Sequence, residues 1–201
     1  MADWDCTVVE GLEQAMGRPP DPDRRRVVLD RAMAYLAEHG LANLTLRRLA
    51  SEMNVSTNTL SYQFGSKEAL VAAALDQARD VTLTFLDSAR QVDPDLKRCM
   101  GKVWAWWLSD RRHLVSTRLN MEAMMSAETD VEPERRPDLL GFWIEYFADW
   151  ITDETGITRI DAVSKSTLLN AVMSGVVVDL LSTGDEDRIE RALQDFLAGF
   201  Y

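Results

Sequence analysis

Apolar side chains recur along most of the chain at intervals of three and four residues, which places them on one face of an α-helix. In the first such segment, the apolar stripe consists of Val28, Leu29, Ala32, Met33 and Leu36. No stretch shows the sustained alternation of apolar and polar residues that is typical of a half-buried strand. The pattern therefore predicts an all-α protein.

Helix boundaries follow from capping residues and from Pro and Gly. Gly40 and Gly184 stand where a left-handed residue would end a helix. Asp93 is expected to cap one helix, with Pro94 at its first position. The pattern predicts some nine helices, over residues 23–38, 46–53, 57–63, 67–91, 94–108, 110–127, from within 132–137 to 154, from 158 or 161 to 182, and 186–199.

The second and third predicted helices are short and are joined by Met53-Asn54-Val55. A helix-turn-helix needs one left-handed residue in its turn, and Asn adopts that conformation most readily after Gly. Val55, Leu60 and Phe64 would form the inner face of the third helix. Most side chains on its opposite face are short, and all are uncharged, which suits close approach to bases and phosphates. This face carries Thr57, Asn58, Ser61 and Tyr62, bordered by Thr59 and Gln63.

Residues 24–70 resemble the DNA-binding head of the TetR family of bacterial transcriptional regulators. The resemblance rests on A-M-A-Y-L-A-E-H-G-L-A-N-L-T-L-R-R-L-A, followed by N-V-S-T-N-T-L-S-Y-Q-F-G-S-K-E-A-L. It implies an all-α fold with an N-terminal three-helix head on a larger helical body. The implied domains are an acidic extension and linker over 1–22, a helix-turn-helix domain over 23–68, and a ligand-binding and dimerisation domain over 69–201.

The resemblance also implies a homodimeric repressor that leaves its palindromic operator when a hydrophobic or aromatic small molecule binds. By the same resemblance, Thr45 faces phosphate, Arg47 reaches DNA, and Lys67 contacts phosphate at a helix start. Ser61 stands where the family usually has Tyr, and Gln63 where it usually has His, so relatives do not predict the operator sequence. The implied positions of the recognition helix are Thr57, Asn58, Thr59, Ser61, Tyr62 and Gln63.

Charge constrains this hypothesis, because the chain holds 33 acidic and 22 basic residues and has a net charge of −11. Residues 18–68 form the exception, with eight basic and six acidic side chains. Long-range attraction to DNA would be absent, so binding would depend on a few phosphate contacts, with a modest salt dependence. A second hypothesis therefore stays open, a helical dimer that binds a ligand or a protein and no longer reads a specific DNA sequence.

Residues 96–150 hold five of the six tryptophans and several methionines. Such side chains line pockets for bulky, flat or hydrophobic ligands, although the same stripes equally fit an ordinary core. Glu122, Glu145 and Asp149 could contact a cationic ligand or simply face solvent. In the segment where the resembled family binds its inducers, the candidate ligand contacts are Met100, Trp104, Trp107, Met121, Met125, Trp143, Phe147 and Trp150.

Residues 166–181 carry small side chains along one stripe, which permits close helix–helix approach. With the apolar segment 139–151, this stripe would form a four-helix interface with a second copy, or else a core within the chain. The first alternative suits a protein with one reading head, since a palindromic operator has two half-sites. The candidate interface residues are Thr167, Ala171, Ser174, Gly175 and Val178.

Other protein classes find little support in the sequence. His39 and His113 are the only histidines, and neither has the spacing of a metal site or a catalytic triad. Gly-rich phosphate loops and Gly-x-Ser-x-Gly turns are absent, so no enzyme activity, cofactor or metal is expected. No apolar run reaches about 18 residues, and the acidic N-terminus does not fit a secretory signal, so we expect a cytoplasmic protein without a membrane segment.

Overall fold

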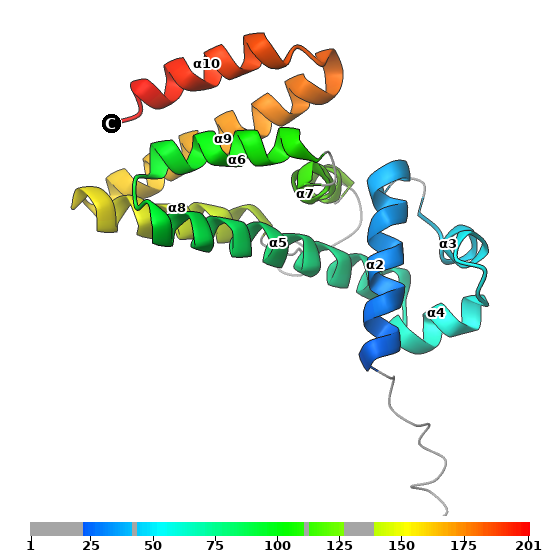
Figure 1. Ribbon diagram of the computed structural model, residues 1–201. Coiled ribbons are helices and arrows are strands. Elements are labelled where there is room, and N and C mark those ends of the chain that lie inside the picture. Colours follow the sequence, from blue (N-terminus) through cyan, green and yellow to red (C-terminus); the bar gives the residue numbers. More distant parts are fainter. Residues whose placement is uncertain (1–21, 42–43, 111–112, 127–138) are drawn as a thin grey trace, which may run out of the picture.

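The computed structural model describes residues 22–41, 44–110, 113–126 and 139–201. These ranges contain no β-strand, so the all-α prediction is confirmed (Figure 1). The extension over residues 1–21 and the helix start expected within 132–137 lie outside the described residues. The helices are α2 (Pro22–His39), α3 (Leu46–Glu52), α4 (Thr57–Phe64), α5 (Lys67–Val92), α6 (Leu96–Ser109), α7 (Leu114–Ser126), α8 (Leu139–Thr155), α9 (Arg159–Thr183) and α10 (Glu186–Ala198).

Helices α2, α3 and α4 form a head at one end of the molecule (Figure 1). Leu36, Leu49 and Leu60, one from each helix, have no exposed surface and belong to one buried cluster. The cluster continues into the first turns of α5 through Leu70 and Ala74. The domain boundary expected at residues 68 and 69 therefore falls inside a helix that contributes to the core of the head.

The local geometry of the head follows its capping residues. Asn54 has a φ of 53° between α3 and α4, which confirms the left-handed turn expected there. The side chains of Thr45, Ser56 and Ser66 cap α3, α4 and α5 by accepting backbone N–H hydrogen bonds, each at 3.1 Å. These hydrogen bonds satisfy N–H groups that a helix start leaves unpaired, and they fix where each helix begins.

Helix α5 runs from the head into a body formed by α6 to α10 (Figure 1). The body has a second buried cluster, which includes the side chains of Leu86, Trp150, Leu169 and Val177. Helices α8 and α9 pack along each other more extensively than any other pair of described helices. The two clusters together place the core of the head and the core of the body at opposite ends of α5.

The start of α6 differs from the sequence prediction. Asp95 is the N-cap and accepts a hydrogen bond from the Arg98 backbone N–H at 2.8 Å, whereas Pro94 precedes the helix. Asp93 instead pairs with the Arg98 guanidinium at 2.7 Å, and this hydrogen bond holds the pKa of Asp93 well below its ordinary value. Two neighbouring carboxylates competed for the cap, and sequence spacing did not decide between them.

Helix α9 revises the expectation about membrane segments. By length and composition it could cross a bilayer, and its most apolar window has a mean hydropathy of 1.4. One such helix is weak evidence for a membrane segment, because core helices of soluble proteins have the same composition. Here α9 packs against α8 on one side and also contacts α7 and α10, which is the arrangement of a body helix.

The head also contacts the body where α2 ends. Gly40 has a φ of 71°, and the backbone N–H of the next residue, Leu41, donates to the Glu122 carboxylate of α7 at 2.5 Å. The Arg118 guanidinium donates to Glu122 Oε1 at 2.7 Å and to the Ala37 carbonyl at 3.3 Å. We call this group of four hydrogen-bonded residues and Gly40 the α2–α7 contact.

Two features of the α2–α7 contact favour glycine at position 40, namely the left-handed backbone and the close approach of the α7 side chains. The variant Gly40→Ala tests both. An alanine there adopts a strained left-handed backbone, and its Cβ would lie 2.8 Å from Glu122 Oε2 and from an Arg118 nitrogen. Gly184, with a φ of 68° and open space around it, is the matched control. We expect Gly184→Ala to lower the free energy of unfolding by about 1–2 kcal/mol, and Gly40→Ala by at least about 1 kcal/mol more.

Urea denaturation of the full-length variants measures both losses from the midpoint and slope of the transition. Equal losses at the two positions would mean that α7 adjusts freely around the end of α2, and the close approach at Gly40 would then have no energetic consequence.

Candidate DNA-binding surface and ligand cavity

Helix α4 presents an uncharged polar face to solvent. Thr57, Asn58, Ser61 and Tyr62 are all exposed on it, and 52% of Tyr62 is accessible. Leu60 and Phe64 lie buried beneath, so the helix is held by its apolar side while its polar side stays open. This placement agrees with the amphipathic pattern of the sequence, and it leaves donors and acceptors available to a partner.

Two residues predicted for this surface are placed differently. Gln63 is 5% exposed, and its Oε1 has no donor among the described residues, so it belongs to the inner side of α4. It follows Leu60 by three residues and precedes Phe64, and the helical period turns it toward the core. Thr59 is half-buried, with its hydroxyl 2.9 Å from that of Ser56, where it strengthens the cap.

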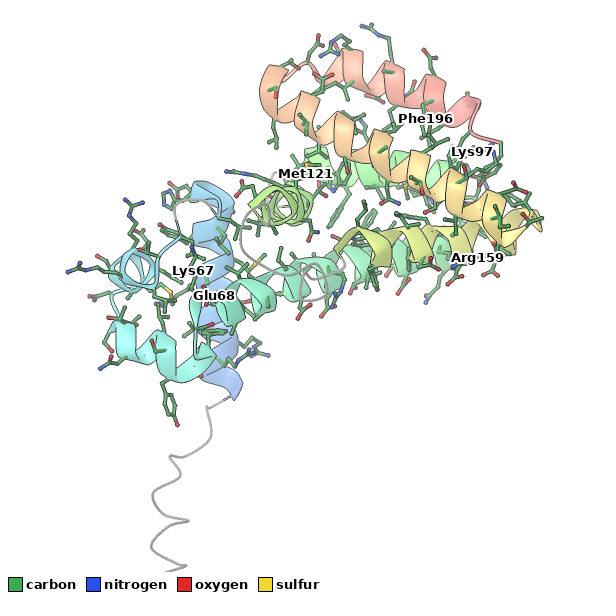
Figure 2. The ribbon with its side chains drawn as sticks, turned by 180° about the vertical axis from the view of Figure 1, so that it is seen from behind. Lys67, Glu68, Lys97, Met121, Arg159 and Phe196 are labelled. Atoms are coloured by element: carbon green, nitrogen blue, oxygen red, sulfur yellow. The ribbon has the colours of Figure 1, made fainter. Side chains whose placement is uncertain are left out.

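Three further candidates surround α4. Thr45 and Arg47, at the start of α3, are exposed, as is Lys67 at the start of α5. Figure 2 shows Lys67 and Glu68 together where α5 begins, next to α4. Hydrogen bonds from its own backbone N–H and from Ser66 lower the pKa of Glu68, so its carboxylate is charged at neutral pH. The surface therefore combines polar groups with little net positive charge.

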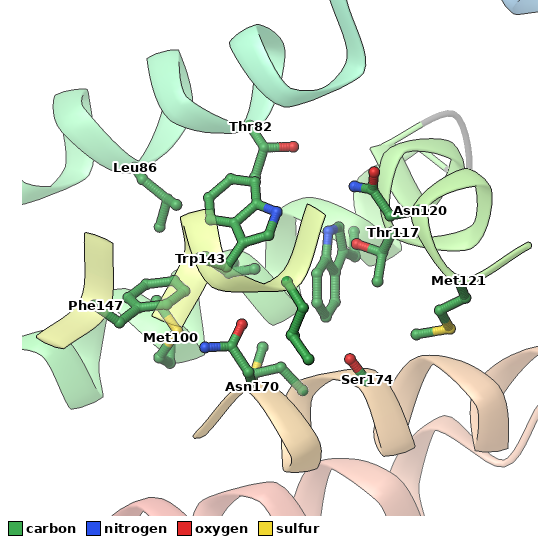
Figure 3. A pocket seen from close by; sticks show the side chains of 14 residues that line it. Thr82, Leu86, Met100, Thr117, Asn120, Met121, Trp143, Phe147, Asn170 and Ser174 are labelled. Atoms are coloured by element: carbon green, nitrogen blue, oxygen red, sulfur yellow. The ribbon is translucent and has the colours of Figure 1, made fainter. Parts of the chain in front are cut away.

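A cavity of about 80 Å³ lies between α5, α6, α7, α8 and α9. Its wall is mostly apolar and contains five of the eight predicted ligand contacts, Met100, Trp107, Met121, Trp143 and Phe147. Figure 3 shows side chains from these helices converging around Trp143. The prediction that Met and aromatic stripes of this segment converge on one site is therefore met for these five residues.

Of the other three predicted contacts, Trp104 and Trp150 are not on the cavity wall. Trp150 is 1% exposed, donates its Nε1–H to the Pro94 carbonyl at 2.8 Å, and packs under Arg90, which makes it a core residue. Trp104 is 3% exposed and lies one turn away from Trp107, outside the lining. The Met125 side chain lies outside the described residues. Sequence periodicity could not separate an apolar face that meets a core from one that meets a cavity.

Polar side chains on the wall were missed by the sequence analysis. Thr117 and Asn120 of α7 point toward the cavity, as do Asn170 and Ser174 of α9 (Figure 3). The signal was present, since each pair is separated by three or four residues on an otherwise apolar helix face. Ser174 was predicted for a subunit interface; it lies on the cavity wall, and its role in an interface stays a prediction.

The rest of the predicted interface stripe is open in the single chain. Thr167, Ala171, Gly175 and Val178 are exposed along α9, and 52% of Val178 is accessible. Three larger apolar side chains of α9 are also exposed, namely Ile160, Leu168 and Leu181. The uncovered face of α9 is thus more apolar than the other solvent-facing helices of the body.

The three carboxylates considered for a cationic ligand have other partners. Glu122 belongs to the α2–α7 contact, and both Glu145 and Asp149 pair with Arg159. None of them lines the cavity, whose described wall residues are all uncharged. A carboxylate contact to a cationic ligand is therefore not part of this site as described.

Two helices connect the cavity to the head. Helix α5 contributes Leu70 and Ala74 to the core of the head, and Thr82 and Leu86 to the cavity wall. Helix α7 contributes Thr117, Asn120 and Met121 to the wall, and Arg118 and Glu122 to the α2–α7 contact. The length of α5 predicted that it connects the body to the head, whereas the connection through α7 was not predicted.

Residues 28–74 match the family model described as bacterial regulatory proteins of the tetR family. The head of this chain is therefore similar to that of the TetR family. A curated relative with this kind of head is the HTH-type transcriptional repressor AcnR of Corynebacterium diphtheriae, which is 26% identical over 185 residues. The match covers 85% of this chain and 87% of AcnR.

Solved structures share the fold of the whole chain. A transcriptional regulator from Saccharomonospora viridis, crystallised with choline, has a TM-score of 0.70 at 20% identity and covers 89% of this chain and 97% of its own. The multidrug binding protein EbrR, complexed with ethidium, has a TM-score of 0.61 at 25% identity, with coverage of 86% and 97%. Both likenesses extend over head and body.

The α2–α7 contact can be tested with Glu122→Ala. The variant leaves the buried Leu41 N–H without its acceptor and Arg118 without its carboxylate partner, so we expect the free energy of unfolding to fall by about 1–3 kcal/mol. Hydrogen exchange at the Leu41 amide should accelerate. Glu145→Ala removes an exposed ion pair to Arg159 and is the control, with an expected loss below about 1 kcal/mol.

Urea unfolding measures the free-energy change, and NMR-detected exchange follows the amide of Leu41. An unchanged Leu41 exchange rate in Glu122→Ala would show that apolar packing on α5 and α7 holds the head without this hydrogen bond.

Proposed function

We propose that this protein is a cytoplasmic, homodimeric transcriptional repressor of the TetR family. It binds a palindromic double-stranded operator through α4 and leaves it when a small molecule occupies the body cavity. The observation that carries the proposal is the outward, uncharged face of α4, with Asn58 and Tyr62 exposed above a buried Leu60. AcnR, which aligns with most of the chain, is named as a transcriptional repressor.

Binding to DNA follows from what this face offers. Short hydroxyl and amide groups permit a helix to enter a major groove and pair with base edges, and an asparagine pairs with two adjacent atoms of adenine. Thr45, Arg47 and Lys67 flank the helix and would contact phosphates. The net charge of −11 gives no long-range attraction, so recognition relies on these local contacts.

Ligand release would act through α5 and α7. A molecule that fits the cavity only after α7 shifts would displace Glu122 from the end of α2 and change the position of the head. Only a ligand with different affinities for the two positions can shift the equilibrium between them. Structural neighbours of the same fold have been crystallised with choline, ethidium and imidazole.

Dimerisation would cover the open face of α9. Gly175 and Ala171 allow a second helix to approach closely, and Val178 and Leu181 supply apolar area. An isologous pairing of α8 and α9 with their symmetry copies forms a four-helix interface and gives the molecule two reading heads.

Asn58→Ala tests the DNA-binding surface. Loss of a bidentate base contact should weaken binding to the promoter region beside the protein's own gene by about tenfold or more, with the fold unchanged. Fluorescence anisotropy with labelled duplex at low salt measures the affinity. Gln194→Ala, which removes an exposed amide on α10, is the control and should bind like the wild type.

Two outcomes would contradict this proposal. Equal affinity of Asn58→Ala and the wild type would remove α4 from the contact. No binding of the wild type to that DNA at low salt would favour the second hypothesis, in which the head no longer reads a specific sequence.

The interface is tested with Val178→Asp and its control Val81→Asp. Both valines are about half exposed, 52% and 49%, but only Val178 lies on the open face of α9. We expect Val178→Asp to weaken the dimer at least tenfold by burying a charge opposite its copy, and Val81→Asp to remain dimeric. Sedimentation equilibrium decides between them, and dissociation by Val81→Asp alone would place the interface on α5.

A further inference from the structure

Trp107 has a buried indole N–H without a partner. Its side chain is 4% exposed and lines the cavity, and its Nε1 has no hydrogen-bond acceptor among the described residues. A buried donor without an acceptor is destabilising, and such groups in native proteins usually have a functional reason or an unseen partner. Because the Trp107 side chain lines the cavity, a molecule bound there is a source of the acceptor that this N–H lacks.

Other polar groups on the wall are also available to a ligand. Asn120 is 8% exposed, and its amide makes no hydrogen bond with another described residue, nor do the hydroxyls of Thr117 and Ser174. Asn170 uses its NH₂ group to donate to Ser166, which leaves its carbonyl oxygen as an acceptor. The wall therefore offers several uncharged donors and acceptors to a molecule inside the cavity.

The same wall disfavours a charged occupant. Its described residues include no acid and no base, so an ion taken there from water would lose its hydration without an opposite charge, and only the aromatic faces would attract a cation. The faces of Trp107, Trp143 and Phe147 favour a flat ring. At about 80 Å³ the space is small, and the flexible side chains of Met100 and Met121 can move to enlarge it.

From these observations we infer that the cavity takes a small, neutral, flat aromatic molecule whose hydrogen-bond acceptor receives the Trp107 Nε1–H. The inference rests on the proposed function, since it names the effector class of that cavity. Two neighbouring structures contain permanent cations, choline and ethidium, and a third, of EbrR, contains imidazole, a small flat ring without a permanent charge. Here the acceptor, rather than a positive charge, selects the ligand.

Four probes of similar size test this selection. Acetophenone carries a carbonyl acceptor, and α-methylstyrene replaces that oxygen by a CH₂ group in the same flat shape. Phenyltrimethylammonium and benzoate carry a positive and a negative charge on the same ring. We expect acetophenone to bind the full-length protein about tenfold more tightly than α-methylstyrene, the effect of one hydrogen bond to a buried donor. Both ions should bind more weakly than acetophenone.

Trp107→Phe removes the donor and keeps an aromatic face, so the ratio of the acetophenone and α-methylstyrene dissociation constants should fall to about one. Trp104→Phe is the matched control. Its indole is 3% exposed, also lacks an acceptor among the described residues, and lies on the same helix outside the cavity wall. That variant should keep the wild-type ratio. Isothermal titration gives the constants, and the Trp107 indole N–H resonance should move downfield with acetophenone only.

Equal binding of acetophenone and α-methylstyrene by the wild type would overturn the inference, as would loss of the ratio in Trp104→Phe or tightest binding by either ion. Binding of none of the four would overturn it too. A failure of the proposed function is distinguishable, because it would show as absent DNA binding in the anisotropy assay while the ligand ratio persists.

Discussion

The arrangement of head and body depends on which groups form hydrogen bonds with the backbone at the C-terminal end of α2. Past Gly40 the backbone leaves the helix, and the N–H of Leu41 is buried and needs an acceptor. Glu122 supplies it from a different helix, and Arg118 balances the carboxylate charge while bonding the Ala37 carbonyl. A residue with a side chain at position 40 would occupy the space that Glu122 needs. The backbone at the end of α2 thus connects the head to α7, which also forms part of the cavity wall.

Much of the head could be read from the sequence, because its determinants are local. The caps at Thr45, Ser56 and Ser66 and the left-handed Asn54 each depend on residues within one turn. The α2–α7 contact could not be read, since Leu41 and Glu122 are 81 positions apart and neither residue type implies the other. It was also hard to predict whether a residue at the border between two helix faces is exposed. Gln63, at the border of the polar face of α4, is buried.

The composition of the sequence predicted which segment of the body forms the cavity, but the positions along each helix did not predict which side chains line it. Met and Trp residues concentrate where the cavity lies, yet Trp104, Trp107 and Trp150 have different roles that periodicity does not distinguish. They differ in whether the indole N–H donates to a carbonyl, as in Trp150, and in whether the side chain lines the cavity, as in Trp107 but not Trp104. That difference is set by tertiary neighbours, which no single helix pattern contains. Thr117 and Asn120 would have been the more informative residues, because polar groups on an apolar face require a reason.

The negative net charge of the chain and the connection between its cavity and its head both bear on how DNA binding could be regulated. With little electrostatic attraction to DNA, affinity would rest on a few local contacts of each head, and in the proposed dimer both heads must match their half-sites together. A small displacement of one head then removes a large part of the binding free energy. Since α7 carries cavity residues and Glu122 within two turns, a ligand that moves Asn120 also moves the support of α2. In the proposed mechanism, the same weak electrostatic attraction that makes DNA binding demanding would allow a small, neutral ligand to release the protein from DNA.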